Sequence, residues 1–379
     1  MKSKRIFSIS IVKNEVDIIE SFVRYNVNVV DGMIILDNNS TDTTLKILKL
    51  LKNEGLPLFI FEDENIEFNQ ADKTNMLLLK AINEFKADII LPLDADEFII
   101  SSNNGNPREL LEKIESDSFY HVRWKTYIPD FSNEQEKFIP AKITLARADN
   151  AQEMHKVILP KELVKNYGVK LTKGNHNLVF NRKYNDSIKR ILSTDLRIAH
   201  FPMRSKEQAI SKISVGWLNS LWDIKRRKNE SWHLQKMFNE LKNNWKLDNE
   251  DIINFAKVYS STTDLNEIKI EKNPIDLTFC GNMEIKYTDN EISPLYGLLD
   301  NCEKVSLDYL NFKKISFAKE KQLKIQIKNL KNQITNLEKE RIAEEKKLKS
   351  KIKNYKNSTS WRVTSPLRKI GNILRNLGN

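Results

Sequence analysis

Apolar residues in the first hundred positions follow two patterns, short continuous runs and longer segments with helical spacing. The continuous runs predict buried strands at Ile6–Val12, Met33–Leu36, Leu58–Phe61 and Ile89–Leu93. Apolar residues at three- and four-residue spacing predict helices near Val16–Val30, Thr43–Glu54 and Ala71–Phe85. Strands that alternate with helices in this way favour an α/β fold with a mostly parallel, doubly wound sheet.

The pattern is less regular after about residue 105. We expect strands near Glu162–Leu171 and Leu178–Phe180, and residues 206–260 have the periodicity of a helical region. Residues 261–312 are polar and weakly periodic, so they predict no particular element.

The C-terminal part carries two further patterns. Heptad spacing relates Leu323, Ile327, Leu330, Ile334 and Leu337, and then Leu348 and Tyr355. Such a seam is buried only against a partner helix, which predicts a coiled coil and a homo-oligomer. After Ser360, a short basic amphipathic helix is expected with apolar residues at Trp361, Leu367, Ile370, Ile373, Leu374 and Leu377.

These patterns divide the chain into four parts. They are a sheet domain at 1–216, a helical or irregular extension at 217–312, a basic coiled coil at 313–357 and a basic amphipathic tail at 358–379. The formal charge of the whole chain is +11, but residues 313–379 hold 19 Lys and Arg against 5 Asp and Glu. The remaining residues therefore carry a charge of −3. The basicity belongs to the C-terminal part, which argues against nucleic acid as a partner of the folded domain.

Composition restricts the protein class further. The two cysteines, Cys280 and Cys302, lie outside any pattern of a disulfide framework or a cysteine zinc site. No stretch reaches the roughly 18 apolar residues that span a bilayer, and no signal peptide is expected. We therefore expect a cytoplasmic protein, held at the inner face of the cytoplasmic membrane by attraction of its basic tail to anionic lipid.

Polar clusters follow three of the predicted strands, at Lys13–Glu15, Asp37–Asp42 and Asp94–Glu97. In doubly wound sheets, ligands bind outside the carboxyl ends of the strands, so we expect the clusters to meet at one crevice. Asp94 and Asp96 are two residues apart, and in an extended segment both carboxylates point to the same side. They can also be a solvated acidic turn, but their position favours binding of a divalent cation or a diphosphate.

Asp37 ends the second predicted strand, where a nucleotide would place its base or ribose. A carboxylate there can accept hydrogen bonds from the N–H of a uracil or from ribose hydroxyls. Ser40 or Asp42 can simply cap the next helix. Asn14 and Glu15 can likewise cap the helix after the first strand, yet they border the same crevice and are candidate nucleotide contacts.

The order and spacing of three segments, Ser8–Glu15, Ile34–Asp42 and Leu93–Phe98, strongly resemble glycosyltransferase family 2, a group with the GT-A fold. Their Lys-Asn-Glu, Asp-Asn-Asn-Ser-Thr-Asp and Asp-Ala-Asp-Glu-Phe motifs resemble a bacterial branch of that family. The likeness is strong over residues 5–100. It is looser to about residue 216, where Ala199–Ser205 and Lys212–Gly216 resemble a late motif of one branch.

The resemblance implies a GT-A-type, Rossmann-like sheet and inverting transfer of a sugar from a UDP-linked or similar nucleotide-sugar, with Mn²⁺ or Mg²⁺. It implies that Asp37 contacts the base and that Asp94 and Asp96 are the pair that holds metal and diphosphate. It also implies that the segment from Gln70 lines the donor site, through Asp72, Lys73 and Asn75.

An inverting transfer needs a general base that deprotonates the acceptor hydroxyl. The sequence departs here from the family's commonest pattern, because no downstream Glu-Asp pair stands in a suitable context. The candidates are Glu97, Asp130 and His176, with His155 as a weaker alternative.

Histidine and arginine add two candidates later in the chain. Leu196–Ala199 is an expected strand that delivers His200 to a loop with Arg204. A neutral imidazole at His200 could complete the metal shell, and Arg204 could meet the diphosphate. Any one histidine can also be a packed or hydrogen-bonded structural group.

Other functions fit the sequence less well. A nucleotidyltransferase or a dehydrogenase needs a glycine-rich phosphate loop after the first strand, where Lys13–Glu15 stands instead. A non-catalytic, membrane-associated scaffold that binds a sugar nucleotide is the alternative, and the presence of Asp37, Asp94 and Asp96 argues against it. A bacterial surface glycan, or a lipid-linked precursor of one, is the acceptor expected by analogy. The sequence does not identify the donor sugar or the linkage.

Overall fold

The structure is a computed structural model of the whole chain. It describes residues 3–63, 70–133, 135–148, 154–222, 231–243, 247–281, 283–288 and 295–376, without the side chains of 296, 297, 300, 301 and 374–376. The chain divides into two compact units, Met1–Glu303 and Lys304–Asn379.

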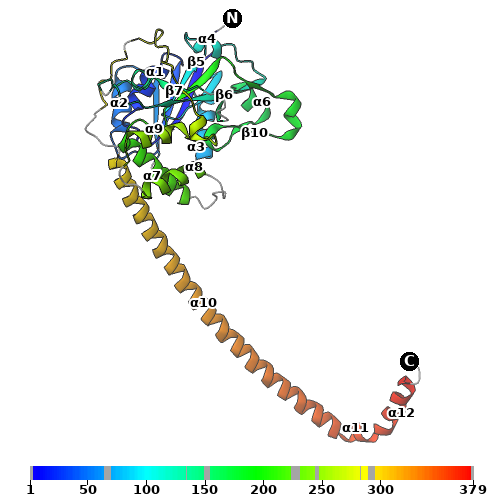
Figure 1. The fold of residues 1–379 in the computed structure, drawn as a ribbon. Coiled ribbons are helices and arrows are strands. Elements are labelled where there is room, and N and C mark those ends of the chain that lie inside the picture. Colours follow the sequence, from blue (N-terminus) through cyan, green and yellow to red (C-terminus); the bar gives the residue numbers. More distant parts are fainter. Residues whose placement is uncertain are drawn as a thin grey trace. The chain divides into compact units, whose positions relative to one another are not determined.

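One mixed sheet forms the centre of the first unit (Figure 1), with strands in the order β13-β7-β6-β8-β4-β1-β2-β3 along its main path. The strands predicted in the first hundred residues are β1 (Ile6–Val12), β2 (Gly32–Asp37), β3 (Leu58–Glu62) and β4 (Ile89–Pro92). β1 pairs in parallel with β2 and with β4, and β2 pairs in parallel with β3. The predicted α/β class and the parallel sheet of this segment are confirmed.

The later strands pair in both directions. They are β5 (Glu97–Ser101), β6 (Ser118–Ile128), β7 (Leu145–Arg147), β8 (His155–Pro160), β11 (Lys189–Leu192), β12 (Leu196–His200) and β13 (Ile270–Lys272). β8 is antiparallel to both β4 and β6, while β12 is antiparallel to β5 and parallel to β6. A separate two-stranded sheet consists of β9 (Lys170–Leu171) and β10 (Leu178–Val179).

Helices cover both faces of the parallel strands because each strand has apolar side chains on both faces. Phe7 and Ile9 belong to the core cluster that holds Leu77 of α3 (Gln70–Asn83), whereas Ile6 belongs to the cluster that holds Phe22 of α1 (Ile19–Asn26). The longer helices are α1 (Ile19–Asn26), α2 (Thr44–Asn53), α3 (Gln70–Asn83), α6 (Lys161–Tyr167), α7 (Lys206–Trp222), α8 (Trp232–Asn243) and α9 (Asn249–Lys257). Short helical turns occur at α4 (Arg108–Leu111), α5 (Ile139–Lys142), η1 (Lys173–Asn175), η2 (Arg182–Ser187) and η3 (Leu265–Glu267).

The expected strand at Glu162–Leu171 is wrong over most of its length. A helix, α6, begins after Pro160 and ends at Gly168, whose φ of 63° lies in the left-handed region. Glycine adopts that conformation at little cost and commonly ends a helix. Only Lys170 and Leu171 at the end of the segment are extended, as β9.

The polar segment that follows residue 216 belongs to the first unit. The boundary expected at 216 falls inside α7, and β13 of the segment pairs with β7. Glu20, which is wholly buried in α1, accepts hydrogen bonds from the backbone N–H groups of Lys286, Tyr287 and Thr288 at 2.8–2.9 Å. Its carboxylate also pairs with Arg24 at 2.8 Å. This one side chain therefore fastens the late segment to the N-terminal half of the sheet.

The second unit is helical. α10 (Leu295–Asn357) begins before the predicted coiled coil and continues into this unit, followed by α11 (Thr359–Val363) and α12 (Ser365–Asn376). The heptad residues are exposed, for example Leu330 at 57% and Leu337 at 63%. Within the described residues, no helix combines the length and the apolar content that crossing a bilayer requires. The side chain of Leu374 and all of Leu377 lie outside the described part of the tail.

We predict that Glu20→Ala destabilises the first unit by about 3–5 kcal/mol, because it leaves three backbone N–H groups without their buried acceptor and leaves Arg24 with Glu54 as its one remaining carboxylate partner among the described residues. Urea unfolding followed by tryptophan fluorescence measures the loss, and trypsin should cut faster after Lys286. Glu84→Ala removes an exposed partner of Lys80 and should cost less than about 0.5 kcal/mol. Equal losses in the two variants would contradict the fastening role of Glu20.

Candidate active site

The carboxyl ends of three parallel strands meet at one edge of the sheet. In the strand register, Val12 lies beside Asp37, and Ile9 lies beside Pro92. The residues that follow β1, β2 and β4 therefore leave the sheet side by side. This confirms that the polar clusters predicted from the sequence converge.

Asn14 ties the first two of these loops together. Its backbone has a positive φ of 55°, and its side-chain oxygen accepts a hydrogen bond from the N–H of Thr41 at 2.8 Å. Its own N–H donates to the hydroxyl of Ser40 at 3.0 Å. The structure thus places Asn14 as a bridge between loops, and its amide oxygen is already occupied.

Asp37 keeps one acceptor available. It is buried, and one carboxylate oxygen accepts the N–H of Ser40 at 2.9 Å. The other oxygen, Oδ1, is buried and has no hydrogen-bond partner within the described part of the chain. A buried acceptor without a donor is costly, so such groups commonly belong to binding sites. The position suits the N–H or O–H group of a ligand.

Arg204 is the centre of a buried charge cluster between the β1 loop and the segment after β12. It donates to both carboxylate oxygens of Asp17, at 2.6 and 2.9 Å, and to Glu15 at 3.0 Å. Burial raises the pKa of Glu15 to about 8 although Arg204 opposes the change. Protein carboxylates therefore bind the guanidinium, so Arg204 and Glu15 hold the two loops together. Nη1 of Arg204 also lies 4.0 Å from Oδ2 of Asp96, and its contact with a diphosphate stays a prediction.

Lys156 of β8 forms a buried ion cluster with the residues after β4. Its ammonium lies 2.5 Å from Asp94 and 3.3 Å from Glu97, and its side chain is 1% exposed. Burial alone would lower the pKa of Lys156, but the two carboxylates outweigh it and the pKa is raised. Burial raises the pKa of Glu97 to about 8, and one of its oxygens accepts the N–H of Asp94 at 3.0 Å.

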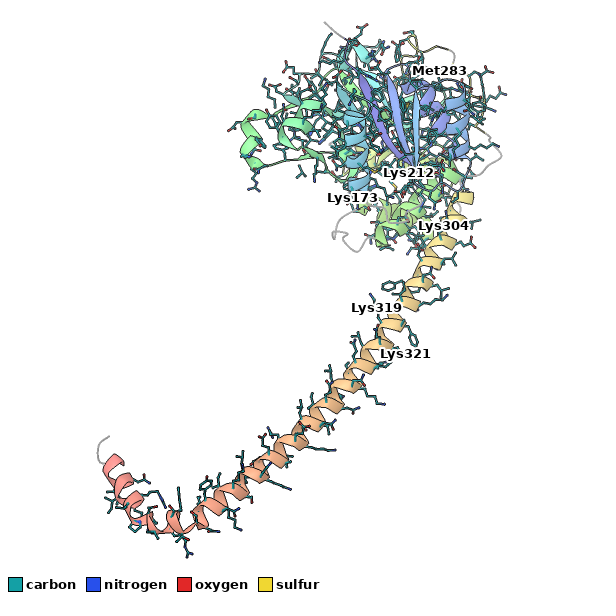
Figure 2. The ribbon with its side chains drawn as sticks, turned by 180° about the vertical axis from the view of Figure 1, so that it is seen from behind. Lys173, Lys212, Met283, Lys304, Lys319 and Lys321 are labelled. Atoms are coloured by element: carbon teal, nitrogen blue, oxygen red, sulfur yellow. The ribbon has the colours of Figure 1, made fainter. Side chains whose placement is uncertain are left out.

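Asp96 faces the ammonium of Lys212 and the imidazole of His200. Its Oδ2 contacts the ammonium of Lys212 and lies 3.6 Å from Nε2 of His200. Burial tends to raise the pKa of Asp96, but Lys212 and His200 outweigh it and hold the pKa well below its usual value. Burial also lowers the pKa of His200, which keeps the imidazole neutral and able to bind a cation. The side chain of Lys212 is marked in Figure 2.

Aromatic rings hold these groups in position. Trp124 of β6 stacks on His200 at 4.0 Å between ring centres, and the ring of Tyr259 lies 5.3 Å from the imidazole at an angle of 58°. The Tyr259 ring also lies 5.2 Å from the Lys212 ammonium. Stacked rings restrict the imidazole to one orientation, with Nε2 toward Asp96.

His176 lies close to the Lys156 cluster. Nδ1 of its ring donates to the carbonyl oxygen of His155 at 2.7 Å, which leaves Nε2 as the acceptor nitrogen. Burial lowers the pKa of His176 to about 4, with a further contribution from Lys156. A Cβ at Gly174 would lie 2.6 Å from the ring, so only glycine fits beneath it.

The three residues predicted on α3 have different surroundings. Lys73 donates to Asn38 at 2.6 Å and pairs with Asp63 at 3.0 Å, so it lies at the ends of β2 and β3. The amide of Asn75 bonds both backbone groups of Leu171 at 2.9 Å, which joins β9 to α3. Asp72 is exposed on the same helix face as Asn75. Of the three, Lys73 is the one that lies beside the residues that follow β2 and β3, at the edge where the polar clusters meet.

The candidate bases also differ in access. Glu97 is wholly buried, so its carboxylate cannot touch an acceptor unless the site opens. Asp130 is partly exposed two residues beyond β6, the strand that places Thr126 beside His200. His176 is partly buried. Glu97 is therefore a buried partner of Lys156, whereas Asp130 and His176 are the accessible candidates for the base.

Sequence analysis assigned no role to Lys156, Lys212 or Asp17. Lys156 is the single charged residue between His155 and Pro160, in an otherwise apolar strand, and a lysine buried in such a strand requires a carboxylate partner. The sequence alone therefore indicates that Lys156 has a carboxylate partner. It does not identify Asp94 and Glu97 as the partners, because β8 pairs with β4 across more than sixty residues of chain.

We predict that Lys156→Met costs about 3–5 kcal/mol of unfolding free energy, because it leaves Asp94 and Glu97 without their buried cation. Adding Glu97→Gln removes one uncompensated carboxylate and should recover part of the loss. The cycle of single and double variants, measured by urea unfolding, should give a coupling of about 1–3 kcal/mol. Strict additivity would contradict the ion cluster.

Neither a family model nor a curated protein matches the chain. Among solved structures, it is similar to the mannosyltransferase PcManGT from Pyrobaculum calidifontis in complex with GDP-Man and Mn²⁺ (13% identity, 70% of this chain and 78% of that chain, TM-score 0.36). It is also similar to GalNAc-T7 with UDP, GalNAc and Mn²⁺ (13% identity, 69% and 55%, TM-score 0.32). A third is glucosyl-3-phosphoglycerate synthase from Mycobacterium tuberculosis (14% identity, 56% and 78%, TM-score 0.28). Because these TM-scores are low, the function is inferred below from the residues of the site.

Proposed function

We propose that this protein is a glycosyltransferase that moves a sugar from a nucleotide-sugar donor, with a divalent cation at Asp96 and His200. The observation that carries the proposal is the convergence of two acidic groups at one edge of the sheet. Asp37, with a free buried oxygen, ends β2, and the Asp94–Asp96 pair follows β4 two strands away. One nucleotide can reach both places, with its base or ribose at Asp37 and its diphosphate at the Asp94–Asp96 pair.

The donor set of Asp96 and His200 fits Mn²⁺ or Mg²⁺ shared with a substrate. Ligand atoms bind such metals at about 2.0–2.2 Å, so two adjacent ligands of one ion lie roughly 3–3.6 Å apart. The 3.6 Å between Asp96 Oδ2 and His200 Nε2 is of this size. The described residues contain no group of three or more such ligands. Two protein ligands, with phosphate oxygens in the other positions, are common where a cation accompanies a diphosphate.

A cation bound there would neutralise the charge that develops on the leaving diphosphate. Lys212 is the residue that has to move, because its ammonium contacts the same oxygen of Asp96. A lysine side chain is flexible, and its ammonium can turn to the phosphate oxygens of the donor. Lys156 is held by two carboxylates and stays in place, where it orients Asp94.

The finer assignment is an inverting transfer, with UDP as the expected nucleotide and a bacterial surface glycan or its lipid-linked precursor as the acceptor. Inversion requires a base on the acceptor side. Asp130 and His176 are the accessible candidates, and Asp130 has the carboxylate that this chemistry commonly uses. The support for this assignment is the resemblance of the three motifs and the access of these two residues.

The second unit serves attachment in this proposal. The exposed seam of α10 pairs with a second copy, and α12 binds anionic lipid at the inner face of the cytoplasmic membrane. Exposed Leu367, Ile370 and Ile373 supply apolar contacts. Arg368 packs on Trp361 at 3.6 Å, which orders the junction between α11 and α12.

We expect Asp96→Asn and His200→Ala to weaken Mn²⁺ binding by roughly 10- to 100-fold, because each removes or neutralises a ligand. Lys212→Ala should strengthen Mn²⁺ binding in the absence of nucleotide, since it removes a competing ammonium. Electron paramagnetic resonance of free Mn²⁺ gives all three affinities.

His121→Ala is the control for these metal titrations. It removes another buried imidazole, one that bonds Arg190 at 3.0 Å and does not face Asp96. Its Mn²⁺ affinity should be unchanged. Unaltered Mn²⁺ affinity in both Asp96→Asn and His200→Ala would overturn the cation site.

The membrane proposal predicts that Ile370→Asp in the full chain reduces binding to vesicles of phosphatidylcholine and phosphatidylglycerol. Asn372→Asp adds the same charge to a polar, exposed position of α12 and should cost about 1 kcal/mol of binding. Ile370→Asp also removes an apolar anchor and should bind at least about tenfold more weakly than that control. Sedimentation with vesicles measures both, and equal binding would contradict insertion of the apolar face.

A further inference from the structure

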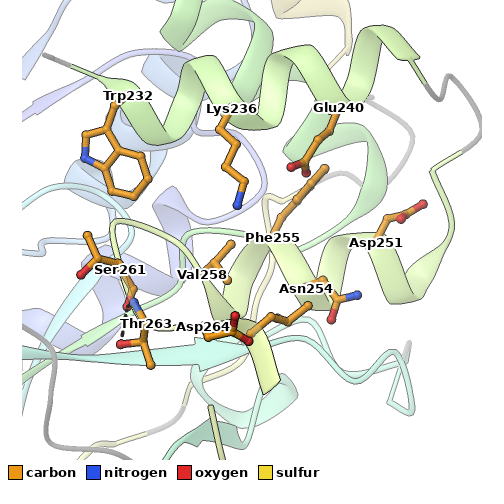
Figure 3. A pocket seen from close by; sticks show the side chains of 12 residues that line it. Trp232, Lys236, Glu240, Asp251, Asn254, Phe255, Val258, Ser261, Thr263 and Asp264 are labelled. Carbon is orange, nitrogen blue, oxygen red and sulfur yellow. Dashed lines mark hydrogen bonds between the residues drawn. The ribbon is translucent and has the colours of Figure 1, made fainter. Parts of the chain in front are cut away.

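A cavity of about 570 Å³ lies between α8, α9 and the segment before η3. None of the predicted site residues lines it. Figure 3 shows its side chains. Trp232 and Lys236 come from α8, Asn254 from α9, and Ser261 and Asp264 from the segment that follows. The volume suits a ligand of one or two sugar rings.

The lining combines an exposed aromatic face with many polar groups. Trp232 is 40% exposed at one end of the cavity, although a ring of this size is usually more buried. Ser261 donates to the hydroxyl of Thr263 at 3.1 Å, and one oxygen of Asp264 accepts the N–H of Asn266 at 2.9 Å. Asp264 is exposed, and Asn266 is the only hydrogen-bond donor to its carboxylate among the described residues. A flat apolar face beside several acceptors and donors is the surface that a sugar ring requires.

The charges of the cavity indicate which ligand it accepts. Three carboxylates, those of Glu240, Asp251 and Asp264, line it together with one ammonium, that of Lys236. This excess of negative charge disfavours a phosphate or a second nucleotide. Hydroxyl groups can donate to the carboxylates and accept from Lys236. The lining therefore favours an uncharged, hydroxyl-rich ligand.

A series of aromatic rings connects the cavity with the candidate active site. The ring of Trp232 lies 5.9 Å from that of His233, and His233 lies 5.1 Å from Tyr259. Tyr259 lies 5.3 Å from His200. Val258, next to Tyr259, lines the cavity itself. The side chains of His233 and Tyr259 thus link Trp232 to His200, and neither of them lines the cavity itself.

We propose that this cavity is a subsite for the acceptor glycan, which binds an uncharged sugar unit on Trp232 at least one residue away from the accepting hydroxyl. The proposal rests on the proposed glycosyltransferase function and deepens it, because it makes the acceptor an oligosaccharide instead of a single sugar. Three ring contacts separate Trp232 from His200, so a sugar unit on Trp232 lies apart from the reacting group. Binding of distal sugar units positions the acceptor without taking part in the chemistry.

The test uses neutral trisaccharides as probes, since the acceptor is unidentified. Saturation-transfer difference NMR on the full chain compares cellotriose, maltotriose, chitotriose and mannotriose at millimolar concentration. At least one trisaccharide should bind. Trp232→Ala should weaken the binding of that trisaccharide by roughly tenfold, the contribution of one stacking contact. Trp232→Phe keeps a stacking face and should retain most of the signal. Gln235→Ala, an exposed position of α8 outside the cavity, should leave it unchanged.

The outcomes separate this proposal from the proposed function. UDP with Mn²⁺ should bind Trp232→Ala as it binds the unaltered chain, which also shows that the variant folds. Binding of none of the trisaccharides, or equal binding by Trp232→Ala, would overturn the subsite and leave the donor site intact. Failure of UDP and GDP to bind the unaltered chain would overturn the nucleotide-sugar proposal, while a trisaccharide signal that needs Trp232 would still support a saccharide site.

Discussion

Buried positive charge at the carboxyl edge of the sheet is the constraint on which the site depends. Lys156 and Arg204 are removed from water and Lys212 is partly buried, and an unpaired cation in such a place would be costly. Each therefore has to meet carboxylates at the strand ends. Asp94 and Asp96 follow β4, so two of the cations are fixed by one short segment. The same requirement positions the acidic pair and ties β8 and α7 to it.

The parallel part of the fold was predictable because its signals are local. A buried parallel strand is a continuous apolar run, and the predicted Ile6–Val12 coincides with β1. The polar residues that follow such runs must lie at one edge, which is why Asp37 and Asp94 could be placed together. The helix at Lys161–Tyr167 was not predicted because a short pattern of alternating apolar residues fits either a strand or a helix. Gly168 ends the helix through its left-handed backbone conformation, which the sequence does not show.

The partners of the site residues were less predictable because pairing across the sheet is not encoded in local pattern. Arg204 was expected at a diphosphate, yet its donors are taken by Asp17 and Glu15, nearly two hundred residues earlier. From sequence, a basic residue near an acidic motif can face either a ligand or a protein carboxylate. Burial decides between the two, since a buried guanidinium needs carboxylates that are already present when the chain folds.

The segment after β12 places the proposed donor site and the proposed acceptor subsite in one structural unit. α7 contributes Lys212 to the acidic pair, and the turn after α9 contributes Tyr259, which packs on His200 and on His233 of α8. Trp232 and Val258 line the cavity and are the sequence neighbours of His233 and Tyr259, the rings that pack toward His200. In the proposed function, a ligand on Trp232 and Val258 would therefore bear on His200 and Lys212 through these neighbouring rings. Acceptor binding would then be coupled to donor binding by side-chain packing.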